Sequence, residues 1–337
     1  MRKLVKKITA IALSAVLIGA AFAGCSGGGN EGTTNGEPTD KTYTVGICQL
    51  VQHPALDAAT EGFKAALTDK LGDKVTFEEQ NAAGDSATCS TITNGFVADG
   101  VDLIMANATP ALQAAAQSTT EIPVVATSVT DFATALDIAD WTGTTGTNVT
   151  GASDLAPLAE QAAMIKELYP DAKTVGILYC SAEANSVYQA NVVTTELEAL
   201  GYTVKSFTAA DTNDVASVAQ TACDESDVIY IPTDNTIASA TETIDPITSA
   251  ANVPVIAGEE GICKGCGVAT LSISYYSNGY KAGEMAAEIL LNGTDPGTME
   301  IAYVDPADLT KEYVADRATA LGTTIPADYV AIDMSEE

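Results

Sequence analysis

The chain has 337 residues, of which 46% are hydrophobic and 18% are charged. This composition excludes an intrinsically disordered chain and suffices for more than one packed domain. The formal net charge of −30 repels phosphate backbones, which argues against a nucleic-acid partner.

The first 25 residues have the pattern of an export signal. Four basic residues precede an apolar run at 8–24, and Cys25 follows it directly. Residues 22–25 (FAGC) resemble the cleavage box of bacterial lipoproteins, in which the Cys becomes the lipidated N-terminus. An ordinary signal peptide with a chance Cys is the alternative. We expect a signal peptide at 1–24 and a lipid on Cys25.

Residues 25–41 are expected to form the lipidated Cys and a flexible tether, because 26–41 is polar, aperiodic and rich in Gly, Ser and Thr. Removing residues 1–24 leaves 11 basic against 45 acidic residues, a net charge of −34. Such a surface repels anionic lipid headgroups, so the lipid must supply the membrane attachment. We expect a protein anchored to the outer face of the cytoplasmic membrane.

From residue 42, short apolar runs alternate with amphipathic stretches. The runs are rich in Val and Ile, as buried parallel strands are, and predict strands at 43–48, 75–80, 101–106, 123–127, 173–179, 202–207, 227–232, 253–257 and 268–273. Helices are predicted at 54–71, 86–99, 110–118, 156–168, 185–200, 212–222, 235–250 and 277–292. This alternation predicts parallel sheets with right-handed crossovers.

The order of elements repeats at an offset near 130 residues. Residues 43–67 parallel 173–200, 101–112 parallel 227–238, and 121–131 parallel 252–261. A repeat of this length predicts two equivalent lobes rather than a solenoid. The expected fold class is α/β, with two Rossmann-like lobes, parallel sheets and an interlobe cleft.

The lobes are expected to exchange chain segments. The first joint falls near 150–156, and another crossing near 267–275 returns the last predicted helix to the first lobe. Lobe one is thus expected at 42–153 plus about 275–297. Lobe two is expected at 154–274 plus about 298–337.

Ligands of open parallel sheets bind beyond the carboxyl ends of the strands. Six loops lie there: 49–53, 107–110 and 127–131 in lobe one, and 180–186, 233–235 and 258–261 in lobe two. Two lobes that face each other across such loops make a cleft that closes on a small molecule.

The loops of lobe one offer hydrogen-bond donors. Thr109-Pro110 has the pattern of an N-cap followed by Pro at the first helical position. The free N–H groups and the positive end of that helix attract a carboxylate, and Thr127, Ser128 and Thr130 add hydroxyls. Capping of its own helix explains Thr109 equally well.

The loops of lobe two carry acids instead: Glu183, Asp234, Glu259 and Glu260. Acids at helix starts are commonly caps, and this alternative stays open for Asp234. Four acids aimed at one cleft suit an ammonium group. Donors on one side and acids on the other describe a zwitterionic α-amino acid. We expect Asp234 or Glu183 to contact its ammonium, with Asn185 and Ser186 in support.

The ligand's side chain is expected against apolar groups of the same loops, where an aromatic ring gains most from burial. These are Leu50 and Val129 with their neighbours, and Gln49, Asn235 and Glu259 complete the expected binding set. His53, the only His, is expected to pack at a helix start, with a place in the cleft wall as the alternative.

Neither a metal, a cofactor nor a catalytic site is expected. The chain has no GxGxxG after its first strand, no GxxxxGK[ST] and no GxSxG, and no nucleophile with its base. Cys263 and Cys266 have metal-knuckle spacing, but a zinc site needs a second pair of ligands. Six cysteines follow Cys25, and their fifteen pairings cannot be distinguished by sequence.

Several loop strings resemble one family in the same order. They are 46–63 (GICQLVQHPALDAATEGF), 107–116, 124–132, 176–189, 230–240 and 254–261 (PVIAGEEG). They are similar to substrate-binding lipoproteins of ABC importers for tryptophan and related aromatic amino acids. The resemblance implies the type I periplasmic-binding-protein fold, a monomer, and an importer of permease plus ATPase.

The chain departs from that family at Leu50, where Phe is common, at Cys48 and Cys180, and at Ser274, where Asp is frequent. The expected function is delivery of tryptophan, tyrosine or phenylalanine to a permease. Another amino acid or organic solute, or a ligand sensor for a membrane receptor, are the alternatives. Sugar sites stack rings on aromatics, which these loops lack, and a DNA-binding regulator would need a helix-turn-helix in place of the export signal.

Overall fold

The computed structural model describes residues 41–305 and 309–335. The expected signal peptide, Cys25 and almost all of the tether lie outside the described residues. Within the described part, no helix is both long and apolar enough to span a membrane.

The first lobe is built on a five-stranded parallel sheet in the order β2-β1-β3-β4-β5. Its strands are β1 (Tyr43–Gln49), β2 (Val75–Asn81), β3 (Leu103–Asn107), β4 (Val124–Val129) and β5 (Val149–Ser153). Its helices are α1 (Pro54–Leu71), α2 (Ser86–Asp99), α3 (Thr109–Ser118), α4 (Phe132–Ala135) and, from much later in the chain, α11 (Tyr275–Asn292). Every residue of β3 and β4 is buried, as expected for strands covered on both faces.

The second lobe has a seven-stranded sheet in the order β12-β11-β10-β9-β8-β6-β7, in which only β11 and β10 pair antiparallel. Its strands are β6 (Thr174–Cys180), β7 (Thr203–Ala209), β8 (Val228–Ile231), β9 (Val255–Ala257), β10 (Ala269–Ser272), β11 (Thr310–Tyr313) and β12 (Val330–Ala331). Its helices are α5 (Leu158–Leu168), α6 (Ala184–Ala199), α7 (Val215–Glu225), α8 (Asn235–Ala238), α9 (Thr241–Ala251), α10 (Glu260–Cys266) and α12 (Ala315–Leu321).

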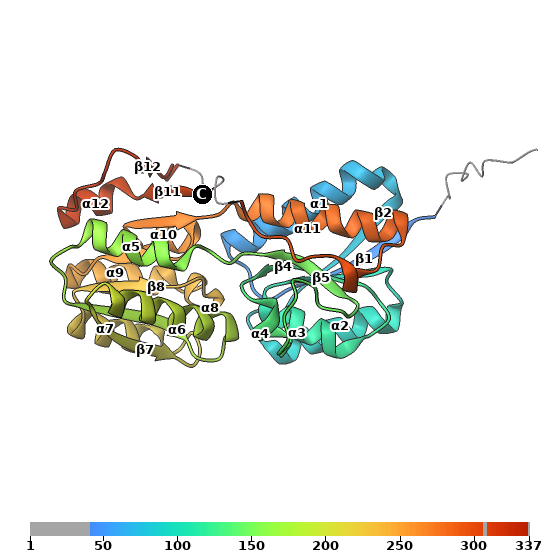
Figure 1. Cartoon of the computed structure of the whole chain (residues 1–337), viewed down its shortest axis with the longest axis horizontal. Coiled ribbons are helices and arrows are strands. Elements are labelled where there is room, and N and C mark those ends of the chain that lie inside the picture. The colour runs from blue at the N-terminus through green and yellow to red at the C-terminus, as the bar shows by residue number, and fades with distance from the viewer. Residues whose placement is uncertain (1–40, 306–308, 336–337) are drawn as a thin grey trace, which may run out of the picture. The chain divides into compact units, whose positions relative to one another are not determined.

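Helix α11 returns to the first lobe and lies along α1 (Figure 1). Glycines make this close approach possible. A Cβ on Gly279 would lie 1.9 Å from the carbonyl oxygen of Ala59, and one on Gly62 would lie 2.1 Å from that of Tyr276. The backbones of the two helices are therefore in direct contact.

All nine predicted strands are present, with ends shifted by one or two residues in most cases. Strands β5, β11 and β12 were not predicted. Strand β5 follows a Thr/Gly-rich stretch that has no apolar periodicity, and β11 pairs antiparallel to β10, which departs from the predicted parallel sheet. The predicted helix 235–250 is two helices, α8 and α9, although Ser239 and Ala240 between them are not helix breakers. Residues 301 and 302 hydrogen-bond to Gly143 and Gly151, so the chain leaves the first lobe somewhat later than the predicted boundary near 298.

Candidate functional site

A small cavity of about 10 Å³ lies where the loops of both lobes meet, so the lobes leave little free space between them in this structure. Both lobes contribute to its wall. It is lined by His53, Ala55, Leu56, Ser128, Thr130, Asp154, Asn185, Thr233, Asp234, Asn235, Ala238, Glu259 and Tyr275. Five of the twelve residues predicted to bind the ligand line it: Ser128, Asn185, Asp234, Asn235 and Glu259.

Hydrogen bonds join the lobes around this cavity. His53 Nε2 lies 3.3 Å from Asn235 Oδ1, and Gln189 Nε2 donates to Thr130 Oγ1 at 3.4 Å. The two lobes are therefore in contact at the cavity wall.

His53 presents a vacant acceptor to the cavity. The Nδ2 group of Asn235 donates to Glu183, so its Oδ1 is the atom that accepts from His53 Nε2–H. Burial lowers the pKa of His53, which keeps the ring neutral. Its Nδ1 then carries a lone pair, and this buried atom has no partner in the described structure. His53 thus belongs to the cleft wall, the alternative that the sequence left open.

The loops of lobe one hold two strained residues next to vacant donors. Ala108 has φ 90° just before α3, and Ser128 has φ 56° at the end of β4. Such conformations in residues other than Gly cluster at ligand sites. The hydroxyls of Thr109 and Ser128 are buried with no partner in the described structure. Of the two, Ser128 lines the cavity and Thr109 does not. The N-cap of α3 is Ala108 rather than Thr109, and no side chain caps this helix, so the predicted capping by Thr109 is wrong.

Glu183 and Asp234 each accept hydrogen bonds that connect neighbouring loops of the second lobe. Glu183 accepts from the backbone N–H and the side chain of both Asn235 and Thr236, at 2.6–3.2 Å, and from Asn185 Nδ2 at 3.0 Å. Asp234 caps α8 through Ile237 N at 2.8 Å and accepts from Cys180 N at 2.6 Å. Capping, the alternative kept open for Asp234, describes both residues, and each has its oxygens occupied in this structure.

Asp154 differs from the other acids of the cavity wall because, among the side chains, its carboxylate accepts only from hydroxyl groups, and it caps no helix. It is fully buried and accepts only from Thr130 Oγ1 at 3.1 Å and Tyr275 OH at 2.9 Å among the side chains. Burial raises its pKa to about 6. Neither Asp154 nor Tyr275 was predicted. The only feature of the sequence that pointed to Asp154 was its position at the expected joint between the lobes, and no feature pointed to Tyr275.

Burial also raises the pKa of Glu259 and of Asp234 to about 7. Glu259 caps α10 through Gly261 N and Ile262 N, and the nearby Asp154 raises its pKa further. No ion pair with a Lys or Arg relieves these three carboxylates in the described part of the chain. The cavity wall therefore holds three buried acids that no described cation pairs with, and burial favours their protonated forms.

The other predicted residues lie nearby but do not line the cavity. Gln49 bonds to Asp57 and Thr60, and Thr127 donates to Asn278. Val129 and Ser186 are fully buried. These four belong to the support behind the loops.

A wider hollow adjoins the cavity at Asn235, which lines both. Apolar atoms of Leu50, Val51 and Pro110 from lobe one face Cys180 and Ala182 from lobe two across it. The predicted apolar wall at Leu50 borders this outer hollow, which we define by those five residues.

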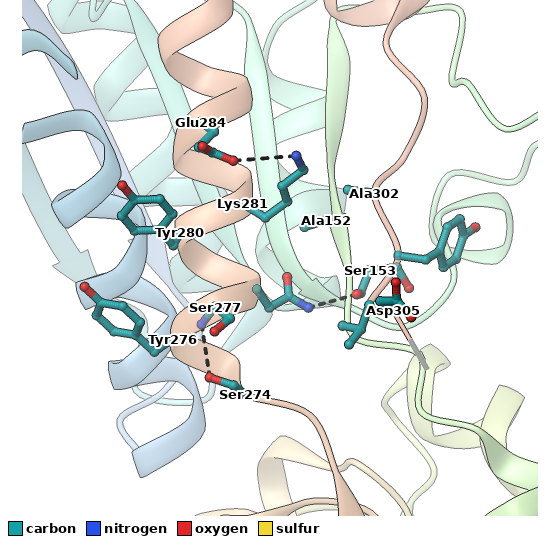
Figure 2. Close-up of a pocket in the computed structure, with 13 residues that line it drawn as sticks. Ala152, Ser153, Ser274, Tyr276, Ser277, Tyr280, Lys281, Glu284, Ala302 and Asp305 are labelled. Carbon is teal, nitrogen blue, oxygen red and sulfur yellow. Dashed lines mark hydrogen bonds and ion pairs between the residues drawn. The ribbon is translucent and has the colours of Figure 1, made fainter. Parts of the chain in front are cut away.

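The largest hollow of the described structure lies elsewhere, between one face of α11 and the strand β5 with the segment at Ala302 (Figure 2). Asn278 Nδ2 donates to Ser153 O at 2.8 Å at its floor, and Lys281 lies 3.5 Å from Glu284 along its rim. It opens to solvent beside the exposed rings of Tyr276 and Tyr303. Its wall has no buried carboxylate or unpaired polar atom, so it is a weaker candidate site.

The described residues contain no group of three His, Cys, Asp or Glu side chains suited to a metal ion. Cys263 and Cys266 are free thiols within α10, and Arg317 binds the carbonyls that end this helix.

Comparison with known proteins assigns the family. The model of the ABC transporter substrate binding protein family matches residues 44–316. The tyrosine-binding protein of Clostridioides difficile strain R20291 is 34% identical over 310 residues, which cover 90% of this chain and 89% of that protein.

Solved structures agree. An ABC domain of Streptococcus pneumoniae in complex with L-Trp matches with TM-score 0.81 and 32% identity, over 85% of this chain and 97% of that one. A ligand-free, open substrate-binding protein with adhesive properties from Clostridium difficile matches with TM-score 0.65 and 34% identity. The match covers 87% of this chain and 100% of that one. The two structures have similar sequence identity to this chain, but the one with bound L-Trp has the higher TM-score. This difference is expected if the two lobes of this chain are closed, as described here.

A myo-inositol-binding protein of Bacillus halodurans, at 14% identity and TM-score 0.59, shares the fold. The predicted type I periplasmic-binding-protein fold is thus confirmed. Proteins of this family bind a solute outside the cytoplasmic membrane for an importer and are not enzymes. This chain belongs to the substrate-binding proteins of ABC transporters.

Proposed function

We propose that the protein binds an aromatic amino acid, namely tryptophan, tyrosine or phenylalanine, between its lobes and delivers it to the permease of an ABC importer powered by an ATPase. The tyrosine-binding relative and the neighbour with bound L-Trp support the aromatic class. The surplus of acids in the cavity is the single observation that supports an amino acid from the structure itself.

Three fully buried carboxylates face the cavity without a cation, which is costly in an apolar interior. A ligand ammonium group would balance this charge. We assign it to Asp154, whose carboxylate accepts only from two hydroxyls among the side chains. The oxygens of Asp234 and Glu183 are held by backbone and side-chain donors, and those of Glu259 by two backbone N–H groups. This assignment replaces the sequence-based preference for Asp234 or Glu183.

The ligand's carboxylate is assigned to the donors of lobe one. Ser128 Oγ and Thr109 Oγ1 are vacant, and the start of α3 supplies N–H groups and the positive end of a helix. The aromatic side chain is assigned toward the outer hollow at Leu50, Val51 and Pro110. A small opening of the cleft would join this hollow to the cavity.

The same proposal includes attachment as a monomer to the membrane through a lipid on Cys25. The basic and apolar pattern before Cys25 supports it. Mass spectrometry of the N-terminus, on protein from the membrane fraction, tests it. An unmodified N-terminus beyond Cys25 would contradict it.

Calorimetric titration tests the ligand class. The protein is unfolded, freed of any carried-over ligand and refolded, and then titrated with tryptophan, tyrosine, phenylalanine, leucine and myo-inositol. We expect at least one aromatic amino acid to bind ten times more tightly than leucine, and no binding of myo-inositol. Failure of all three aromatic amino acids would leave the family assignment intact and refute the ligand class.

A further inference from the structure

Helix α2 lies directly on strand β1, on the face of the sheet away from α1. The contact is closest at Gly46, where an added Cβ would lie 2.6 Å from the ring of Phe96. Because Gly46 has no side chain, the ring of Phe96 rests on the strand itself. This contact fixes the position of α2 along β1.

This packing of α2 on β1 brings two cysteines together. Cys48 is two residues beyond Gly46 and so lies on the same face of β1. Cys89 precedes Phe96 by seven residues, which is two turns, and so lies on the same face of α2. The helix starts at the carboxyl end of the sheet and runs back along it, which places its first turns over the end of β1.

The side chains meet accordingly. Cys48 and Cys89 are both completely buried in the same apolar cluster. Each thiol is also the first-named influence on the pKa of the other, as expected for neighbouring side chains. Both are free in this structure. They come from different elements, and 41 positions separate them in the chain.

The other cysteines of the described chain have no comparable arrangement. Cys263 and Cys266 lie one turn apart within α10, so a bond between them would constrain only that turn. The thiol of Cys180 donates to Ala210 O at 3.6 Å. No cysteine is among the neighbours that act on Cys223. The pair of Cys48 and Cys89 is therefore the one contact through which a bond would join two separate elements.

We propose that Cys48 and Cys89 form a disulfide bond in the exported protein. An Sγ–Sγ bond forms, both thiol protons are released, and two electrons pass to a disulfide oxidant, such as oxidised glutathione or a thiol oxidoreductase, which becomes two thiols. Solute-binding proteins of importers work outside the cytoplasm, where such bonds persist. Since both sulfurs are buried in the folded chain, oxidation takes place during folding.

The bond would stabilise one wall of the outer hollow. Cys48 directly precedes Gln49 and Leu50, and Cys89 follows the loop at Gly84 and Asp85, which lines the same hollow as Leu50. A disulfide at this point joins the bases of both loops. The inference rests on export alone and is independent of the ligand proposed above.

Peptide mapping tests the bond. The reduced full chain is unfolded, refolded with a glutathione redox couple, alkylated in denaturant without further reductant, digested and analysed by mass spectrometry. We expect a peptide that links Cys48 to Cys89, with Cys180, Cys223, Cys263 and Cys266 alkylated. Alkylation of both Cys48 and Cys89 after oxidative refolding would overturn the proposal.

A thermal measurement provides a second test that does not depend on peptide recovery. Disulfide reduction should lower the melting temperature of the oxidised parent by about 5–10 °C. The variant with Cys48→Ala and Cys89→Ala should show no such response, whereas the control with Cys263→Ala and Cys266→Ala should respond like the parent. A response that is lost in the control and kept in the first variant would overturn the proposal, as would a parent that does not respond.

Discussion

Asp154 shows how a single residue defines the site. It follows β5, at the point where the chain leaves the first sheet, and its carboxylate meets the hydroxyls of Thr130 and Tyr275 inside a closed cavity. Two neutral hydroxyls compensate only part of the cost of burying a carboxylate, which is why its pKa rises to about 6. A ligand ammonium would supply the missing charge-assisted contact.

The substitution Asp154→Asn should therefore weaken amino-acid binding by more than tenfold, since losing a buried charged partner costs roughly 2–5 kcal/mol. Titration calorimetry with the best aromatic ligand measures the loss. The matched control is Asp140→Asn, because Asp140 is exposed and does not line the cavity, and it should bind like the parent. If Asp154→Asn also binds like the parent, Glu259 becomes the candidate for the ammonium.

At the scale of secondary-structure elements, the seam between α1 and α11 holds the returning segment in the first lobe. It is made of backbone contacts at Gly62, Gly279 and Gly283, where any side chain would collide with the opposite helix. Glycine weakens a helix on its own, so these positions trade intrinsic helix stability for close packing.

The substitution Gly279→Ala should reduce the free energy of unfolding by roughly 1–3 kcal/mol or more, because the helices must move apart. Gly95→Ala is the matched control. Gly95 lies in α2 with nothing within 4 Å of an added Cβ, so alanine there should raise stability by about 0.5–1 kcal/mol. Urea unfolding of both variants distinguishes the two effects. Equal changes of the same sign would show that the seam is not tightly packed.

At the scale of the whole molecule, the buried acids make folding stability and ligand affinity depend on pH. The folded ligand-free protein holds protons on Asp154, Asp234 and Glu259 to higher pH than an unfolded chain does, with pKa values of about 6 to 7. The stability that these groups contribute is fully present below about pH 4 and is lost as pH rises through 6 to 7. An ammonium ligand favours their ionised forms, so its affinity should change in the opposite direction.

We expect the melting temperature of the ligand-free parent to fall relative to that of Asp154→Asn between pH 5 and pH 8, because the variant lacks one of the titrating groups. Amino-acid affinity of the parent should rise over the same interval. Thermal unfolding and calorimetry at both pH values measure the two trends. Parallel melting curves for parent and variant would show that Asp154 does not ionise in this interval.

The sequence by itself determined the two-lobe α/β fold and pointed to loops that line the cavity between the lobes. Val- and Ile-rich strands alternate with helices, and this order repeats near 130 residues, so local periodicity was sufficient. It also placed Thr109 at a helix start and Ser128 at a strand end, which are local features, although the N-cap of α3 is Ala108.

Only the tertiary structure decided which side chains meet. The sequence does not distinguish Glu183 and Asp234 from Glu259 as acids of the expected cleft. The contacts of Glu183 with Asn235 and Thr236, which are 52 and 53 positions away, depend on how two loops pack together. Asp154 and Tyr275 are separated by 121 positions, and the contact of Cys48 with Cys89 follows from the packing of α2 on β1. Local sequence patterns determine helices and strands, whereas the cost of burying unpaired polar groups and the register of packed elements act between distant residues.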